Sequence, residues 1–257
     1  MKLGRLKPKR YKKTLLLANY ITPGALPPNP VSFGWSKGIA PTGWGMDAND
    51  TVGDCTAAGV AHLLLAWTNA NGHPVKANTQ EVLEFYTAIT GYDPRQTDAF
   101  GNNITDTGAA CEDVLDYLQK TGIKVGNTVH RIDAYAACEP GNINHIKSCI
   151  EIFGSCYIGV NLPIAAANQQ VWSIPPGELT GDYAPGSAGG HCIIITDYDP
   201  HFVKVISWGQ QYYATWAWIQ AYIDEAYACI STQDFITHNQ TPAGFALGNL
   251  IADAKLL

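Results

Sequence analysis

The sequence predicts an α+β protein of two lobes, in which a helical amino-terminal half precedes a largely antiparallel sheet. Two observations support this prediction. Between residues 55 and 153 apolar side chains recur with helical spacing, and after Gly154 they form short runs rich in β-branched and aromatic residues. Helices that come first and strands that come second are typical of an α+β architecture. No internal repeat or low-complexity tract suggests another arrangement.

Four helices are predicted in the first half. The segment from about 55 to 70 is apolar and alanine-rich, and the segment from about 79 to 90 gathers its large apolar residues on one face. A third helix is expected near 109–120. A fourth is expected at 143–153, where isoleucines recur every three or four residues and Gly154 supplies a stop signal.

Three strands are predicted after the last of these helices. They cover residues 156–160, 191–196 and 202–208, each bounded by Gly, Pro or Asp. The segment 197–201 between the last two has the composition of a hairpin turn. Residues 215–228 form an amphipathic segment with a wide aromatic face, for which packing on the sheet is the preferred interpretation over a binding platform.

The composition is that of a globular protein able to bury a sizeable core. The chain has 257 residues, of which 46% are hydrophobic and 15% charged. Its cysteines are odd in number and lack a C-x-x-C spacing, so we expect mostly reduced, buried thiols and neither a disulfide framework nor a zinc ribbon. No cofactor or metal is predicted, because the pair His145 and Cys149 is only a weak two-ligand match. The seven cysteines are 55, 111, 138, 149, 156, 192 and 229.

No segment resembles a signal peptide or a membrane span. The basic stretch Lys2–Lys13 is followed by an apolar stretch, 15–18, that is too short for a signal-peptide core. No apolar run approaches the length a bilayer needs. We therefore expect a cytoplasmic or virion-associated protein without a membrane partner.

The charge is distributed unevenly along the chain. Residues 1–46 contain eight Lys/Arg and no Asp or Glu, whereas the remaining eight Lys/Arg are outnumbered by 22 acidic residues, a net charge of −14. This basic arm could bind nucleic acid or an acidic protein surface, or it could fold back over its own acidic domain. Both interpretations remain open on the sequence. Prolines make residues 20–46 an extended wrapping segment rather than a helix.

Three parts of the chain follow from these patterns. Residues 1–29 form the basic extended arm, and 30–235 form the two-lobed domain. Its helical lobe spans about 45–150 and its β lobe about 151–235. Residues 236–257 are a carboxyl-terminal extension, whose apolar positions from Phe245 onward lie on a helix-like face that could dock on the domain or on a neighbour.

Cys55 is the first candidate for chemistry. It directly precedes the apolar stretch of the first predicted helix, so its thiol would lie at the positive end of a helix dipole. There a thiolate is stabilised and backbone N–H groups can hold an oxyanion. The competing interpretation is structural, because small buried cysteines are common on helix faces.

His191 is the best candidate for a base that would accept the thiol proton. It follows Gly189 and Gly190, which allow a substrate to approach closely, and it begins a predicted strand. A thiol hydrolase needs a nucleophile, a base, a group that orients the base, and donors for the oxyanion.

The order of these pieces resembles the papain-like cysteine peptidases over most of the chain. Asn49 lies six residues before Cys55, where that family has its oxyanion-hole glutamine, and Gly53 lies two before it. The other similar segments occur in the family's order. They are 31–38, 108–123, 153–160, 190–198 and 207–209.

The resemblance implies a papain-like two-lobed fold and a cysteine peptidase acting on peptides or proteins. Cys55 would be the nucleophile, His191 the base, and Asn49, together with the Cys55 N–H, the oxyanion donor. The family's orienting asparagine falls on Ile206, which cannot accept an imidazole N–H. Strand alternation from His191 places Ser207 in that position instead.

Two further departures bear on activity. Asp54 directly precedes Cys55, and a carboxylate there would oppose thiolate formation unless it caps the helix. Thr56 replaces the tryptophan that usually follows the nucleophile. A second hypothesis is therefore a catalytically weak or inactive papain-fold binding or structural protein, for example in a viral particle or a homo-oligomeric or larger assembly, with the arm as its tether. Nucleic-acid binding through the arm alone is a weaker third, because the body is acidic.

Overall fold

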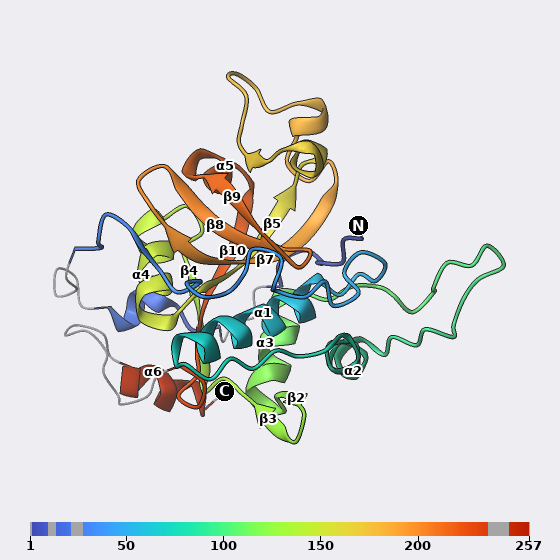
Figure 1. Ribbon diagram of the computed structural model, residues 1–257, viewed down its shortest axis with the longest axis horizontal. Helices are drawn as coiled ribbons and strands as arrows, with labels where there is room; N and C mark the ends of the chain where they lie inside the picture. The colour runs from blue at the N-terminus through green and yellow to red at the C-terminus, as the bar shows by residue number, and fades with distance from the viewer. Residues whose placement is uncertain (1, 10–13, 22–27, 236–246, 257) are drawn as a thin grey trace.

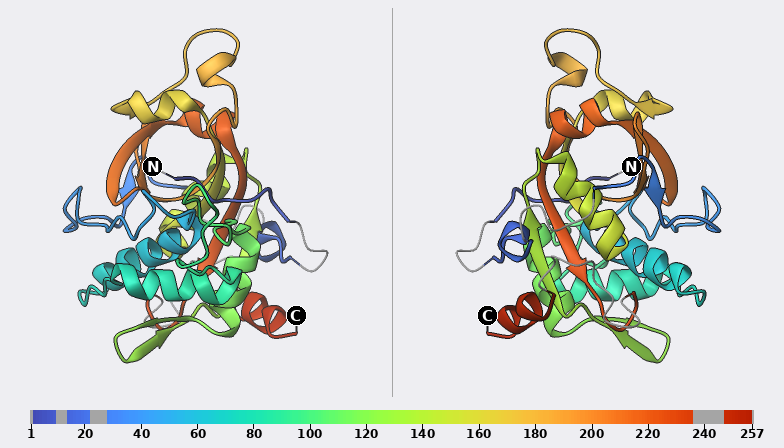
Figure 2. Two further views of the ribbon diagram at one scale, coloured as in Figure 1. Left: turned by 90° about the vertical axis from the view of Figure 1, so that its right-hand side faces the viewer. Right: turned by 90° about the vertical axis from the view of Figure 1, so that its left-hand side faces the viewer.

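A strongly curved sheet and a group of helices packed below it make up the computed structural model, which describes residues 2–9, 14–21, 28–235 and 247–256 (Figure 1). The sheet lies in the upper part of Figure 1, and α1 to α3 lie beneath it. The two views of Figure 2 show the sheet almost closing into a ring above the helices. The predicted α+β architecture in two lobes is therefore confirmed.

Eight strands form the main sheet within the described residues, in the order β4-β10-β5-β7-β8-β9-β6, with β1 on β7. All neighbours are antiparallel except β6 and β9. The strands are β1 (Phe33–Gly34), β4 (Ala134–Cys138), β5 (Cys156–Leu162), β6 (Val171–Trp172), β7 (Gly189–Tyr198), β8 (Phe202–Ser207), β9 (Gln210–Thr215) and β10 (Ile223–Ile230). A separate hairpin pairs β2 (Ile123–Val125) with β3 (Thr128–His130).

The helices follow the predicted pattern. Helix α1 (Cys55–Ala70), α2 (Thr79–Thr90) and α4 (Ile143–Phe153) have the expected bounds, and α3 (Cys111–Lys120) begins two residues later than expected. Asn78 caps α2 with a reciprocal capping box, and Gly91 ends it at a positive φ of 76°. The remaining elements are the helix α5 (Trp216–Tyr222), the helix α6 (Leu247–Ala254) and three short 3₁₀ turns, η1 (Leu17–Tyr20), η2 (Ile164–Asn168) and η3 (Gly181–Tyr183).

The two faces of the sheet belong to different cores, because strand side chains alternate. On β7, Ile193 and Ile195 pack with the aromatic interior of the curved sheet, whereas Cys192 and Ile194 pack against α1. Helix α1 approaches the sheet at Gly59. A Cβ there would lie 2.9 Å from the ring of Tyr157. Cys55, the first residue of α1, therefore lies on a helix that packs closely against the central strands.

The carboxyl-terminal part of the sheet differs from the sequence prediction. The amphipathic segment 215–228 is not one continuous element, because the short helix α5 is followed directly by strand β10. Strand β10 pairs with both β4 and β5, so backbone pairing with distant segments determines its conformation. Its side chains are buried on both faces. The expected packing on the sheet is thus present, in the form of a strand within it.

Helix α6 gives structure to the end of the chain. It packs beside β4 and η1, with Leu250 fully buried, and Tyr20 donates a hydrogen bond to Asp253 (2.8 Å). Phe245 of the expected helix-like face lies outside the described residues. No helix in the described part of the chain is long and apolar enough to cross a membrane.

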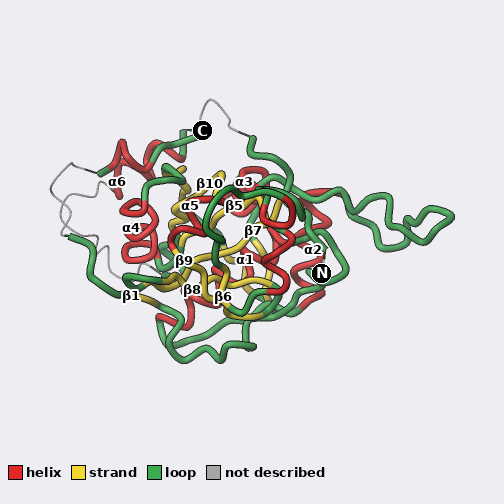
Figure 3. The backbone as a smooth tube through the Cα atoms, turned by 90° about the horizontal axis from the view of Figure 1, so that it is seen from above, coloured by secondary structure: helices red, strands yellow, loops and turns green. Residues whose placement is uncertain are grey.

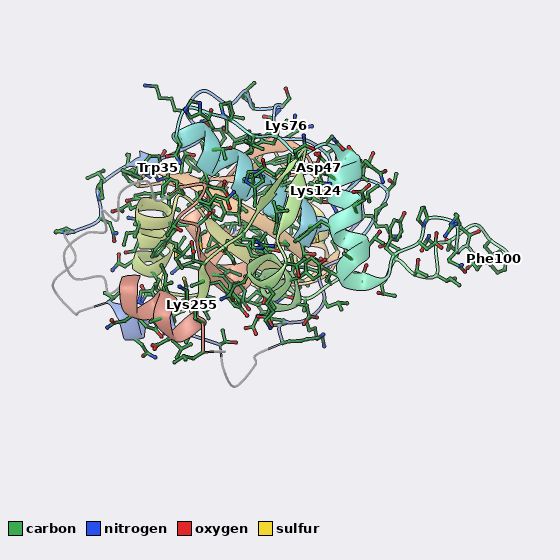
Figure 4. The ribbon with its side chains drawn as sticks, turned by 90° about the horizontal axis from the view of Figure 1, so that it is seen from below. Trp35, Asp47, Lys76, Phe100, Lys124 and Lys255 are labelled. Carbon is green, nitrogen blue, oxygen red and sulfur yellow. The ribbon has the colours of Figure 1, made fainter. Side chains whose placement is uncertain are left out.

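The loop between α2 and α3 extends away from the body of the molecule. Figure 3 shows it as a long projection, and Figure 4 shows Phe100 at its far end. Phe100 is 91% exposed. The base of the loop is ordered by hydrogen bonds of Asp93, Asn103 and Thr105.

Candidate active site

Cys55 is the first residue of α1 and is 1% exposed. Its thiol lies beside the backbone of Cys192, the residue after His191, and beside that of Gly4 from the amino-terminal arm. The helix start therefore faces strand β7 with arm backbone next to the sulfur. No hydrogen bond among the described residues joins the Cys55 thiol to His191.

His191 is oriented by Ser207 and covered by Trp208. The His191 Nε2 lies 2.7 Å from the Ser207 Oγ, and the imidazole stacks on the Trp208 ring with centroids 4.7 Å apart. The two polar residues come from neighbouring strands, β7 and β8, while Ile206 is buried on the other face of β8. Trp208 has a positive φ of 46°, a conformation rare for a non-glycine residue, and this brings its ring over the imidazole.

The second imidazole nitrogen of His191 remains available. His191 Nδ1 is buried and has no hydrogen-bond partner within the described residues. If Nε2 carries the proton and donates it to Ser207, Nδ1 is an acceptor. This is the tautomer that a proton-accepting base requires.

Asn49 and Asp54 form a buried polar pair beside Cys55. The Asn49 Nδ2 donates to Asp54 Oδ1 at 3.1 Å and to the Val52 carbonyl at 3.3 Å. Asp54 occupies the N-cap position of α1, but its side chain makes no capping hydrogen bond. Burial raises the pKa of Asp54 to about 8, so this carboxyl is largely neutral at pH 7. Once Asp54 is ionised, its charge contributes, after burial, to the raised pKa of the Cys55 thiol.

Residues 2–6 of the arm lie across this site. The Lys2 N–H donates to the Asn49 carbonyl (3.3 Å), and the Arg5 N–H donates to the carbonyl of Gly190 (3.3 Å). On the opposite side, the Ala109 N–H donates to Gly4 (2.9 Å). The arm thus joins the helical lobe to strand β7 directly over the residues that flank Cys55. Figure 2 shows the amino terminus between the curved sheet and the helices.

Gly4 is the residue of closest approach. A Cβ on Gly4 would lie 1.7 Å from the Gly53 carbonyl oxygen, and a Cβ on Gly108 would lie 2.0 Å from the Gly4 carbonyl oxygen. Only a glycine fits at position 4 with the arm in this place. The arm is therefore seated against backbone on two sides.

The arm's basic side chains pair with acids of its own domain. Lys2 forms an ion pair with Asp106, and Lys9 forms one with Asp113 at 2.6 Å. Arg5 is bound most extensively, by two carboxylates of β10. Of the two interpretations of the basic arm, the described residues adopt the strap over the acidic body. Binding of an external acidic partner or nucleic acid stays a prediction.

The covered site holds both reactive groups in their neutral forms. Burial raises the pKa of the Cys55 thiol to about 12. Burial, with a smaller contribution from the charge of Arg5, lowers the pKa of His191 to about 3. Neither a thiolate nor an imidazolium is favoured while the arm is seated.

The other histidines considered from the sequence have structural roles. His62, on α1, is buried and its Nε2 lies 2.9 Å from the Gly45 carbonyl oxygen. His145 accepts a hydrogen bond from the Glu139 N–H at 3.4 Å. No group of three or more potential metal ligands occurs in the parts of the chain that the structure describes.

Two residues at the site were not singled out from the sequence. Trp208 was identified only as part of a motif, and Arg5 only as one of the arm's charges. The position of Trp208 directly after Ser207 in the sequence could have indicated that its ring lies near His191. Nothing in the sequence distinguishes Arg5 from the other basic residues of the arm, because its partners lie more than 150 residues away.

The fold of this chain is similar to those of solved cysteine proteases. No family model matches the sequence, and no curated protein matches it. Among solved structures, xylellain, a cysteine protease from Xylella fastidiosa, superimposes with a TM-score of 0.64 at 13% identity, covering 89% of this chain and 96% of that one. Procathepsin B S9 from Trypanosoma congolense gives a TM-score of 0.59 at 10% identity, covering 90% and 86%.

A third structure is the Carica candamarcensis cysteine protease CMS1MS2 in complex with E-64. It gives a TM-score of 0.52 at 12% identity and covers 79% of this chain and 99% of that one. Identities this low are informative about architecture only. The chain therefore has the fold of the papain-like cysteine proteases.

Proposed function

We propose that this protein is a papain-like cysteine peptidase whose own amino-terminal arm covers its active site at rest. The observation that carries the proposal is the His191–Ser207 hydrogen bond. It fixes one imidazole nitrogen at 2.7 Å from a hydroxyl and leaves the other without a partner in the described chain. This arrangement lies beside the helix start at Cys55.

In the proposed reaction, the Cys55 sulfur attacks the carbonyl carbon of a peptide bond and His191 Nδ1 takes the thiol proton. The imidazolium then gives that proton to the leaving amine as the C–N bond breaks. Water hydrolyses the resulting thioester and restores the thiol. Ser207 orients the ring by accepting a hydrogen bond from Nε2–H in both the imidazole and the imidazolium.

The developing oxyanion would be bound by the Cys55 N–H at the start of α1, together with the Asn49 amide. In the resting state that amide donates to Asp54 and Val52. Its service as an oxyanion donor therefore requires it to exchange one of these acceptors for the substrate oxygen.

The arm must leave before a substrate can bind, because it fills the space next to Cys55. Its departure would also hydrate the site and remove the Arg5 charge. Hydration shifts the pKa of His191 upward and that of Cys55 downward, since burial is the main cause of each shift. Loss of the Arg5 charge raises the pKa of His191 further. Uncovering the site and activating the thiol are thus one event.

A second candidate function is a papain-fold binding or structural protein. The observation that favours it is the arm seated over Cys55 and beside His191, with thiol and imidazole both neutral. A chain that never released its arm would have no use for Cys55 as a nucleophile. The viral-particle and larger-assembly versions of this hypothesis stay predictions.

A thiol-reactive epoxide distinguishes the two functions. For a peptidase, labelling at neutral pH is expected to be confined to Cys55, lost in His191→Ala and unchanged in the matched control His145→Ala. Peptide mapping by mass spectrometry identifies the labelled thiol. Labelling no faster than that of free cysteine, even after the arm is displaced, would rule out the peptidase.

A further inference from the structure

The guanidinium of Arg5 occupies a pocket lined by two carboxylates. Arg5 Nη1 donates to Glu225 Oε1 at 2.6 Å, and Nη2 donates to Asp224 Oδ2 at 2.9 Å. Nη2 also lies 3.2 Å from the Val160 carbonyl oxygen and 3.4 Å from Asn161 Oδ1. The side chain of Arg5 is 1% exposed. One cation is therefore matched to two acids and two further acceptors.

The pocket is formed by two neighbouring strands of the sheet, β5 and β10. Its carboxylates lie on β10, where the pairing with β5 is irregular between Ile223 and Glu225. The Tyr227 hydroxyl donates to Glu225 Oε2 at 2.8 Å, which fixes the carboxylate. Gly159 on β5 provides the room, since a Cβ there would lie 2.7 Å from Arg5 Nη1.

The pocket is also next to the reacting groups. The Arg5 backbone N–H is bound by Gly190, the residue before His191, and the preceding Gly4 lies beside the Cys55 thiol. A side chain in this pocket thus belongs to a chain segment that passes over the nucleophile. A peptide that followed the path of the arm would place one of its side chains here.

The charge of the pocket determines which side chain is acceptable. If an apolar side chain replaced Arg5, the carboxylates of Asp224 and Glu225 would lose their cation while remaining covered. Glu225 also lines a cavity of about 490 Å³ whose described lining includes Glu112 and Glu139 but no lysine or arginine. A cationic side chain of a bound peptide would supply the charge that this lining does not.

We propose that the pocket of Asp224 and Glu225 is the specificity pocket of the cleft and selects peptides that present an arginine side chain to it, with Arg5 as its intramolecular occupant. Lysine ranks second, because its ammonium cannot reach two carboxylates and a carbonyl as the planar guanidinium does. This specificity rests on the proposed peptidase function. The pocket's preference for a cation can be measured without it.

The test uses the full chain carrying Arg5→Glu, in which like charges expel the arm while the rest of the pocket is unchanged. Cys55→Ser is added for binding measurements, so that no peptide is consumed. The probe is a fluorescent peptide with the sequence of residues 2–7, compared with the same peptide in which glutamine replaces the arginine. Circular dichroism verifies that each variant is folded.

The arginine peptide is expected to bind about 30-fold or more tightly than the glutamine peptide, which corresponds to loss of one buried charge pair. Adding Glu225→Gln, or the more exposed Asp224→Asn if the former fails to fold, should reduce this ratio to below about fivefold. Adding Asp113→Asn, which removes the carboxylate that pairs with Lys9, should leave the ratio unchanged. Equal binding of the two peptides would overturn the proposal.

A mixed peptide library incubated with the Arg5→Glu chain separates the pocket from the peptidase. Cleavage sites with arginine enriched at one fixed position would support both proposals. Cleavage without that enrichment would overturn the specificity and leave the peptidase standing. An arginine-selective chain that cleaves nothing would overturn the peptidase and support the pocket as a site for cationic side chains.

Discussion

Removing the guanidinium of Arg5 is expected to uncover Cys55. The side chain of Arg5 is 1% exposed and is bound by Glu225 at 2.6 Å and by Asp224 at 2.9 Å. Breaking a buried ion pair by deleting one partner costs about 3–5 kcal/mol. In Arg5→Ala that cost falls on the docked state of the arm, because the carboxylates become hydrated when the arm leaves.

The lower end of this range corresponds to about a 100-fold increase in the population with the arm released. While the arm is docked most of the time, the labelling rate of Cys55 is proportional to that population. The second-order rate constant for alkylation of Cys55 should therefore rise about 100-fold. It is measured by iodoacetamide labelling at pH 7 followed by quantification of the Cys55 peptide.

Lys9→Ala is the matched control, since it also removes one positive charge from the arm. The Lys9 side chain is 49% exposed, and its pairing with Asp113 is worth about 0–1 kcal/mol. Its labelling rate should stay within about fivefold of the wild type. The reasoning is refuted if Arg5→Ala labels no faster than Lys9→Ala, because the arm would then not be held by the buried pair.

Three further outcomes are expected. In the Arg5→Ala chain, where the arm is released more often, Ser207→Ala should lower kcat/KM for a fluorogenic peptide about tenfold, and His191→Ala should lower it at least 100-fold. Equal losses in the two variants would argue against a positioning role for Ser207. The pKa of Asp54 is about 8 in the folded protein and 3.8 for an unperturbed aspartate, so the folded state binds more protons and stability falls as pH rises from about 4 to about 8. Asp54→Asn should remove this dependence on pH. The free energy of unfolding in urea of the variant, minus that of the wild type, should therefore increase with pH by up to about 1.4 kcal/mol per pH unit. A difference that stays constant between pH 5 and 7.5 would contradict the neutral carboxyl. Gly59→Ala should destabilise the protein by about 1–3 kcal/mol in urea, because its Cβ meets an aromatic ring of β5 at 2.9 Å, whereas Gly141→Ala, whose Cβ meets nothing within 4 Å, should change little.

Local patterns were sufficient for most helices of the fold. The bounds of α1, α2 and α4 follow from apolar periodicity and from stop signals such as Gly154, all of which act within a few residues. Strands β5, β7 and β8 were also visible as apolar runs. Strands β4, β9 and β10 were not, because their conformation depends on pairing with partners distant in sequence.

The candidate site divides in the same way. Cys55 and His191 were recognisable from the helix start and the glycine-flanked strand, and Ser207 from the alternation of side chains along β8. The hydrogen bonds of Asn49 to Asp54 and Val52 were not foreseeable, since they depend on the fold of the loop that precedes α1.

The sequence by itself determined the helical lobe, the strand that carries His191, the candidate nucleophile and the basic character of the arm, because each is written in short-range spacing and composition. Only the tertiary structure decided where the arm lies. The two carboxylates that bind Arg5 are separated from it by more than 200 residues and lie together only because β10 inserts beside β5. The position of the arm over Cys55 depends on contacts of Gly4 with both Gly53 and Ala109, which no local pattern encodes. The state of the thiol, neutral and covered at rest, therefore follows from long-range packing and burial rather than from the residues that flank it.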